Sequence, residues 1–166
     1  MNSEILDQLP PQNIEAEQSV IGIVLLKPDM FGKMNLTATD FHAEEHQRIW
    51  RVCEGLAKQG VGIDHITIMD RLRAEDSTEK HLSRRALSDN HAAALAEAVQ
   101  FVAVTAHWAY YRDIVVRTRA KRLAIHFLIE LLHGAYDDEV EPEQWVETLL
   151  TRGERMQKWL KQKRRT

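Results

Sequence analysis

Apolar residues recur at the spacing of an α-helix in several separate segments of this chain. Asn13 is placed to cap the first helix and Pro28 to end it, and its apolar stripe consists of Ile14, Val20, Ile21, Val24 and Leu25. A second helix is expected to be capped by Thr39 or Asp40 and to end at Gly60, with a stripe made of Phe41, Ile49, Trp50, Cys53 and Leu56. The N-terminal third of the chain is therefore predicted to be helical.

The middle of the chain carries weaker helical signals. Asp64 is expected to cap a helix that includes Ile66, Ile68, Met69 and Leu72, residues 73–88 are expected to form a loop with some helix, and Ser88 or Asp89 is expected to begin the next helix. Only 7 glycines and 4 prolines interrupt 166 residues that are rich in good helix formers. An all-α fold is predicted.

Two long helices are expected near the C-terminus. The first lies between Thr105 and His133, and a helix of roughly 28 residues is about 40 Å long. Gly134 marks its end, Pro142 suits the first position of the next helix, and that helix carries Trp145, Leu149, Arg152, Met156 and Trp159 at spacings of four and three. A short connection between long helices predicts an antiparallel hairpin.

This hairpin has more apolar residues than two helices can hide between themselves. Leu128, Leu132, Leu150 and Leu160 belong to the surplus. The residues predicted to mediate self-association or to bind a partner are Tyr111, Ile114, Val115, Leu123, Phe127, Leu131, Trp145, Leu149, Met156 and Trp159. The alternative is that the same residues pack on the chain's own core.

The patterns predict four regions along the chain. Residues 1–12 are expected to form a flexible N-terminal arm that ends in a Pro-Pro pair, and residues 13–103 to form a globular helical head. The dimerising helical hairpin is expected over residues 104–160, followed by a basic tail over 161–166.

Charge is distributed unevenly along the chain, which has a net charge of -3. Residues 152–166 hold seven basic residues and one acidic residue, whereas no Lys or Arg occurs between Glu130 and Glu147. The basic residues expected to contact DNA or phosphate, at most weakly, are Lys161, Lys163, Arg164 and Arg165. Solvated helix faces are the alternative interpretation of this charge.

Several classes of protein are disfavoured by the sequence. Cys53 is the only cysteine, so neither an intramolecular disulfide nor a cysteine-based zinc site is expected. The polar N-terminus and the short apolar runs predict neither a signal peptide nor a membrane span. A cytoplasmic protein without membrane contact is expected.

No pattern predicts catalysis or a bound cofactor. Gly32-Lys33 is the only Gly-Lys pair, and it lacks the preceding glycine and the following hydroxyl residue of a phosphate-binding loop. His42 and His46, with Glu45 between them, match the His-x-x-Glu-His spacing of some zinc hydrolases, but no third ligand is recognisable. A packed or surface histidine pair is the preferred interpretation, and the zinc site is kept as an alternative.

The segment from Leu9 to Gly22 resembles the opening of bacterial DnaB-type replicative helicases, where a Pro-Pro pair leads into Glu-Ala-Glu and an apolar turn that ends in glycine. Further matches follow in register: Leu26-Lys27-Pro28-Asp29, Asp40-Phe41 four residues ahead of Glu45-His46, Gly62-Ile63-Asp64 before Thr67, and Ala109-Tyr110-Tyr111-Arg112-Asp113-Ile114-Val115. The resemblance extends to about Leu160 and ends before the family's linker helix and ATPase motor.

The resemblance implies a scaffold without catalytic activity. In that family, hairpins pair the domains into dimers, three dimers form a collar, and the collar receives primase and sometimes loader proteins. This chain departs from the family at 81–86, where a Gly-Gly turn is usual, and at 100–105, which replaces a turn with proline. The resemblance therefore does not predict which partner the loop at 81–86 contacts, nor the angle between the head and the hairpin.

The resulting hypothesis is a self-associating module of DNA replication, forming a homodimer or a trimer of dimers. Its expected partners are a replicative helicase, primase or a helicase loader, and it is either a separate adaptor or regulator or part of a helicase. The alternatives are a mimic of the helicase-binding part of primase, a DNA-binding module that uses the basic tail, and the zinc hydrolase at His42 and His46.

Overall fold

The computed structural model describes residues 9–76, 84–101, 105–137 and 139–164. Within these ranges the chain consists of α-helices and short 3-10 turns, with no strand. The predicted all-α fold is confirmed. The chain divides into two compact units: a head unit, Asn13–Val116, and a hairpin unit, Met1–Gln12 together with Arg117–Thr166. The boundary predicted after residue 103 stays a prediction, because 102–104 lie outside the described ranges.

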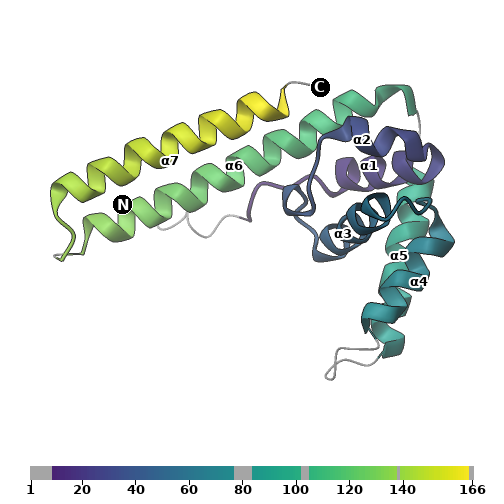
Figure 1. The fold of residues 1–166 in the computed structure, drawn as a ribbon. Coiled ribbons are helices and arrows are strands. Elements are labelled where there is room, and N and C mark those ends of the chain that lie inside the picture. The colour runs from purple at the N-terminus through teal and green to yellow at the C-terminus, as the bar shows by residue number, and fades with distance from the viewer. Residues whose placement is uncertain (1–8, 77–83, 102–104, 138, 165–166) are drawn as a thin grey trace. The chain divides into compact units, whose positions relative to one another are not determined.

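The head unit is built from five α-helices and the first residues of a sixth, with short 3-10 turns between them (Figure 1). In chain order its elements are α1 (Ile14–Leu26), η2 (Pro28–Met30), α2 (Phe31–Met34), η3 (Ala38–Asp40), α3 (Glu44–Lys58), α4 (His65–Asp76), α5 (Arg84–Phe101) and η4 (Thr105–His107). α1 packs against α3 and α5, and α4 packs against the same two helices.

Helix α1 lies at the centre of the head unit. Asn13 caps it as predicted, because the side-chain oxygen of Asn13 accepts a hydrogen bond from the backbone N–H of Ala16 at 2.8 Å. Every residue from Ala16 to Val24 is buried, including polar ones. A helix buried on all sides has no wide polar face, so its polar residues must find partners inside the protein.

Trp50 of α3 fills the largest single part of this core. Its ring lies 5.0 Å from that of Phe31 and 4.9 Å from that of Phe41, measured between centroids. Its indole N–H donates to the carbonyl oxygen of Leu36 at 3.2 Å. The aromatic residue that the sequence placed on the α3 stripe therefore ties α3 to the turns that precede it.

The predicted start of α3 is wrong. Thr39 and Asp40 do not cap it; Asp40 instead closes a capping box with Thr37 on the 3-10 turn η3. α3 begins at Glu44, and its N-cap residue, Ala43, offers no side-chain acceptor. The N–H groups of His42 and Ala43, just ahead of this helix, donate to a carboxylate from another helix, that of Glu17 in α1.

The bounds of α4 and α5 partly agree with the sequence prediction. Asp64 caps α4 as expected, because its Oδ1 accepts from the backbone N–H of Thr67 at 2.8 Å. α5 begins at Arg84 rather than at Ser88 or Asp89, so the predicted start is wrong. Residues 84–87 are Arg-Arg-Ala-Leu, all good helix formers, and they extend the helix towards its N-terminus. Residues 81–83, which belong to the loop where this sequence departs from the family pattern, lie outside the described ranges.

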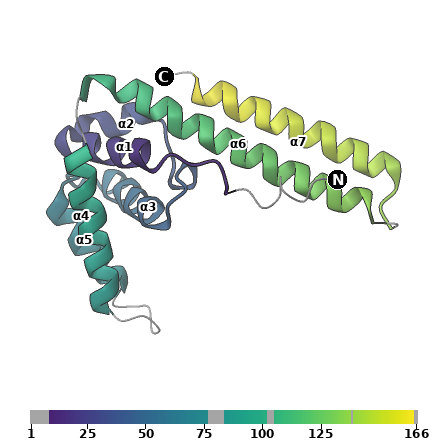
Figure 2. The same ribbon diagram turned by 180° about the vertical axis from the view of Figure 1, so that it is seen from behind.

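The hairpin unit consists mainly of two long helices that lie side by side and antiparallel (Figures 1 and 2). α6 (Trp108–Ala135) belongs to this unit from Arg117 onwards, and α7 (Pro142–Lys163) runs antiparallel beside it. Pro142 occupies the first turn of α7 as predicted. The antiparallel hairpin expected from the sequence is thus confirmed.

Within the described ranges, no single helix is both long and apolar enough to cross a membrane. Residues 90–100 and 105–135 have sufficient length and apolar content only when the two helices are taken together.

Candidate functional site

The inner seam of the hairpin holds α6 and α7 in register. The indole N–H of Trp145 donates to the carbonyl oxygen of Leu131 at 2.9 Å, and Leu131 is buried. Gly134 faces the Trp145 ring, which lies 3.5 Å from the position of a Cβ at that glycine. Arg152 pairs with Glu130 at 3.3 Å. The contacts between α6 and α7 therefore bury part of the surplus apolar surface of the hairpin.

One broad side of the hairpin carries a set of exposed apolar residues, called here the outer apolar face. A helix turns by about 100° per residue, so Leu128 lies to one side of Phe127, which lines the space between α6 and α7, and Val146 lies to one side of Trp145. Because the helices are antiparallel, residues that follow a seam position lie on the same broad side of the hairpin. The face consists of Ile125 (43% exposed), Leu128 (61%), Val146 (47%), Leu149 (37%) and Leu150 (59%).

The opposite side of the hairpin carries the hairpin groove, a depression of 240 Å³ between α6 and α7. Its lining residues are Leu123, His126, Phe127, Glu130, Arg152, Arg155, Met156 and Trp159. His126 and Arg155 precede Phe127 and Met156, which line the space between the two helices, and this places them on the side away from the outer apolar face. The hairpin therefore has two chemically different sides.

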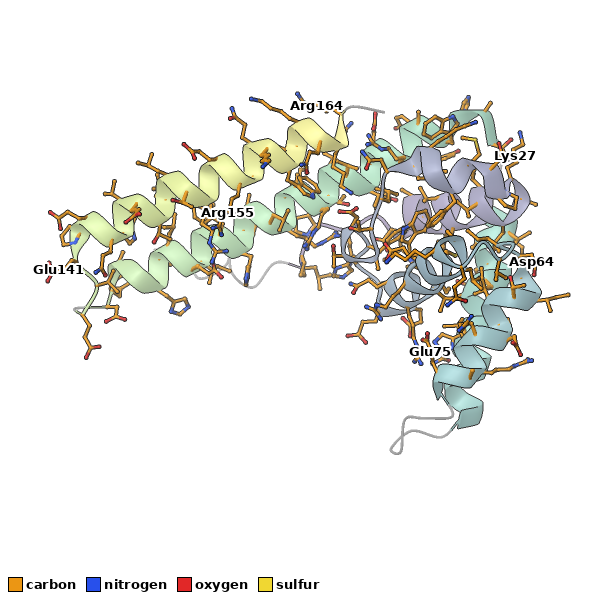
Figure 3. All side chains as sticks on the ribbon, in the orientation of Figure 1. Lys27, Asp64, Glu75, Glu141, Arg155 and Arg164 are labelled. Atoms are coloured by element: carbon orange, nitrogen blue, oxygen red, sulfur yellow. The ribbon has the colours of Figure 1, made fainter. Side chains whose placement is uncertain are left out.

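Helix α7 has acidic residues at its start and basic residues at its end. Figure 3 labels Glu141 and Arg164 at the two ends of this helix, with Arg155 between them. Glu143 and Glu147 follow Glu141, whereas the C-terminal half adds Arg152, Arg155, Lys158, Lys161 and Lys163. Glu143, Val146, Glu147, Leu150 and Glu154 line a second, shallower groove along the outer surface of α7.

The residues predicted for self-association fall into three places. Tyr111, Ile114 and the buried Val115 belong to the head unit. Leu123, Phe127, Met156 and Trp159 line the hairpin groove, and Leu131 and Trp145 form the seam. Leu149 alone lies on the outer apolar face. Ile125, Leu128, Val146 and Leu150 were outside the predicted set, although Leu128 and Leu150 belong to the surplus of apolar residues that the sequence indicated.

The predicted basic tail is partly incorporated into α7. Lys161 and Lys163 are helical, and Arg164 follows as the C-cap. Lys163 is buried, and its ammonium nitrogen lies 5.8 Å from the centre of the Trp159 ring. Arg165 lies outside the described residues. DNA contact by these residues stays a prediction.

Two arginines of α6, Arg112 and Arg122, have partners within the chain. Arg112 is buried and donates to the carbonyl oxygen of Met34 at 3.1 Å, and it also pairs with Asp113 at 2.7 Å. Arg122 donates to the carbonyl oxygen of Pro11 at 2.8 Å. These contacts hold the chain together rather than leaving the guanidinium groups for a nucleic acid.

The two histidines of the alternative zinc site lie at the start of α3, and both are hydrogen-bonded to the side chain of Glu17. The Glu17 carboxylate accepts hydrogen bonds from the backbone N–H groups of His42 (2.6 Å) and Ala43 (3.2 Å), and it bonds His46 Nδ1 at 2.9 Å. Among the described residues, no cluster of three or more His, Cys, Asp or Glu side chains could hold a metal ion. The arrangement suits a helix cap, a role of Glu17 that helical spacing alone did not indicate.

Comparison with known families decides the assignment of the fold. The family model described as the DnaB-like helicase N-terminal domain matches residues 9–117. The chain belongs to this family.

Relatives of the DnaB-type domain are much longer than this chain. The Bacillus subtilis replicative DNA helicase DnaC is 30% identical over 145 residues, which cover 85% of this chain and 30% of that protein. The Rhodothermus marinus replicative DNA helicase DnaB is 31% identical over 147 residues, which cover 82% of this chain and 15% of that protein. The chain thus spans less than a third of the length of either relative, and the family match concerns the N-terminal domain.

A solved structure shows the same fold. The N-terminal domain of DnaB helicase from Mycobacterium tuberculosis aligns with a TM-score of 0.71 and 24% identity, covering 87% of this chain and 97% of that one. The DnaB-type resemblance stated from the sequence is confirmed. Both the family model and this solved structure concern the N-terminal domain of a DnaB-type helicase.

Proposed function

We propose that this DnaB-type domain is a non-catalytic interaction module of DNA replication, which self-associates through the outer apolar face and docks a replicative helicase, primase or helicase loader. The observation that carries the proposal is the cluster of exposed apolar side chains on one side of the hairpin, with Leu128 61% exposed and Leu150 59% exposed. Burying a leucine fully stabilises an association by about 1.5–3 kcal/mol. Contiguous exposed apolar patches mark interaction sites.

Charge along α7 supports a second copy as the occupant of this face. In a twofold-symmetric dimer the same surface meets itself, so two α7 helices lying antiparallel bring the acidic start of one beside the basic end of the other. Glu143 and Glu147 would then face Lys161 and Arg164 of the second copy. Complementary charge favours this orientation over the parallel one, in which like charges meet.

The solution mass of the chain tests self-association. At 19.2 kDa per chain, light scattering is expected to give a dimer or a larger multiple. Leu128→Glu and Leu150→Glu place a carboxylate in the face and are expected to give a monomer. Ile66→Glu in α4 is the matched control, because Ile66 is 78% exposed but belongs to the head unit. A wild-type monomer, or equal effects of all three substitutions, would contradict the proposal.

Partner docking is tested by adding a purified replicative helicase or primase to the wild-type chain. The expected result is a complex of larger mass with one of the two proteins. If neither protein changes the mass of the chain while the wild type still self-associates, docking is refuted and self-association stands. The two outcomes are separable because the chain can self-associate without binding either protein.

A further inference from the structure

The two helices of the hairpin leave an open position for a third helix. The hairpin groove lies between α6 and α7, on the side away from the outer apolar face, so self-association through that face leaves the groove uncovered. Its floor consists of Leu123, Phe127, Met156 and Trp159, each of them only partly buried. A groove between two packed helices accommodates the apolar face of a further helix, as in helical bundles.

The length of the groove corresponds to about two helical turns. Its lining residues run from Leu123 to Glu130 on α6 and from Arg152 to Trp159 on α7, and such a stretch of helix spans about 11 Å. A helix lying along the groove therefore places apolar side chains at positions i, i+3, i+4 and i+7 over the floor. Met156 suits such a site, because its flexible thioether side chain adapts to the shape of a partner.

The rim of the groove and the surface beside it are basic. Arg155 lines the groove from α7 and is exposed, and no ion pair involves it among the residues that the structure describes. Glu130 is the one carboxylate among the lining residues, and it already lies 3.3 Å from Arg152 and 3.3 Å from His126. Arg119, about two helical turns before His126, continues this side of α6. An acidic partner is therefore attracted to the rim, whereas a basic one is repelled.

The floor of the groove favours a peptide over a nucleic acid as the acidic partner. Single-stranded nucleic acids stack their bases on exposed aromatic faces. Here the ammonium nitrogen of Lys163 lies 5.8 Å from the centre of the Trp159 ring, and the aliphatic side chains of Leu123 and Met156 share the floor with the aromatic rings. This mixed apolar surface is complementary to the leucine-type side chains of an amphipathic helix.

We infer that the hairpin groove binds a short acidic amphipathic helix of a partner protein, with the apolar face of that helix on the floor and its carboxylates beside Arg152 and Arg155. The bound helix completes a three-helix bundle with α6 and α7. This binding rests on the partner docking proposed above, and it supplies the surface and the chemistry of the partner segment. Self-association uses the other side of the hairpin, so the two can occur together.

Synthetic peptides test the groove in the full chain. The probe is a fluorescein-labelled peptide of about four helical turns, with leucine at positions i, i+3, i+4 and i+7 and glutamate on its flanks. Fluorescence anisotropy is expected to show that this peptide binds at least about tenfold more tightly than the same peptide with lysine in place of glutamate. Equal binding of the two peptides would overturn the proposal. An acidic peptide in which alanine replaces leucine is expected not to bind, and undiminished binding of that peptide would also overturn it.

Variants of the chain place the peptide in the groove. Arg155→Glu puts a carboxylate on the rim and is expected to remove the preference for the acidic peptide. Lys158→Glu is the matched control, because it makes the same change of charge on the same helix outside the groove, and it is expected to leave the preference in place. In ¹⁵N NMR spectra the acidic peptide is expected to shift the indole N–H signal of Trp159 but not that of Trp50 in the head unit. A preference that survives Arg155→Glu, or an unshifted Trp159 signal, would overturn the assignment.

Further measurements separate this binding from its alternatives. A fluorescein-labelled oligothymidylate is expected to bind more weakly than the acidic peptide; tighter binding that is lost in Arg155→Glu would assign the groove to single-stranded nucleic acid and overturn the proposal. Arg155→Glu is expected to keep the wild-type solution mass, because this residue lies on the side away from the outer apolar face. If a purified replicative helicase or primase binds the wild type and Arg155→Glu equally, docking stands and the groove is not its surface. If the acidic peptide binds in the groove while neither protein binds the chain, docking of those proteins fails and the groove assignment stands.

Discussion

Glu17 is expected to be the polar side chain on which the stability of the head unit depends most. The residue is fully buried, and its carboxylate accepts three hydrogen bonds from the start of α3, at 2.6, 3.2 and 2.9 Å. It also places negative charge at a helix N-terminus, where the peptide dipoles favour it. Glu17→Ala removes all of these interactions at once.

The cost of Glu17→Ala follows from what it leaves behind. A hydrogen bond to a charged group contributes about 1.5–3 kcal/mol, and a buried donor without an acceptor costs about 1–3 kcal/mol. His42 and Ala43 are only partly buried, so water can reach their N–H groups and the three terms do not simply add. A loss of about 3–5 kcal/mol in the free energy of unfolding is expected.

Urea denaturation followed by tryptophan fluorescence, at one fixed protein concentration, measures this loss. Glu17→Gln keeps the shape but turns one acceptor into a donor, so it is expected to cost about 1–3 kcal/mol. Glu15→Ala is the control, because Glu15 lies in the same first turn but is exposed; it is expected to cost less than about 1 kcal/mol. If Glu17→Ala costs no more than Glu15→Ala, the role assigned to Glu17 is wrong.

Three further outcomes are expected. Burial raises the pKa of the Cys53 thiol to about 12, so a thiol reagent should react with the native chain only at the rate of unfolding; immediate reaction at neutral pH would contradict its burial. The hydrogen bond from the Thr67 N–H lowers the pKa of Asp64 below 3.8, so the ionised cap stabilises α4 above pH 3.8 and this effect is lost as the pH falls through the lowered pKa. Asp64→Asn should therefore make the free energy of unfolding depend less on pH in the acid range. An unchanged pH dependence would contradict this role of Asp64. Trp50→Phe should cost about 1–3 kcal/mol in urea denaturation by leaving the Leu36 carbonyl without its donor, and a neutral result would contradict that bond.

Local signals in the sequence were sufficient for the starts of α1, α4 and α7. Asn13, Asp64 and Pro142 each act on residues within a few positions of themselves, so their roles at helix ends follow from the sequence pattern alone. The start of α3 was missed because its acceptor, Glu17, lies 25 residues away from His42. A cap supplied by another helix depends on packing, which periodicity does not encode.

The exposed apolar residues of the hairpin were identified only in part for a related reason. Apolar spacing identified the hairpin, but it did not separate seam residues such as Phe127 and Trp145 from neighbours such as Leu128 and Val146, which lie on the outer apolar face. A shift of one residue turns a helical side chain by about 100°. That separation requires knowing which faces of α6 and α7 meet.

Reversal of charge on α7 tests self-association most directly. One variant combines Glu143→Lys with Glu147→Lys, and the other combines Lys161→Glu with Arg164→Glu. In an antiparallel pair of α7 helices each variant repels itself, whereas a mixture of the two restores opposite charges at both ends of the pair. A change of 1.4 kcal/mol alters an association constant about tenfold.

Sedimentation equilibrium of the wild type, of each variant and of their equimolar mixture gives the answer. The account predicts association of the wild type, association roughly tenfold weaker for each variant alone, and recovery of the wild-type mass in the mixture. A mixture that sediments as the average of two non-associating variants, or variants that associate as strongly as the wild type, would contradict self-association through this face of the hairpin.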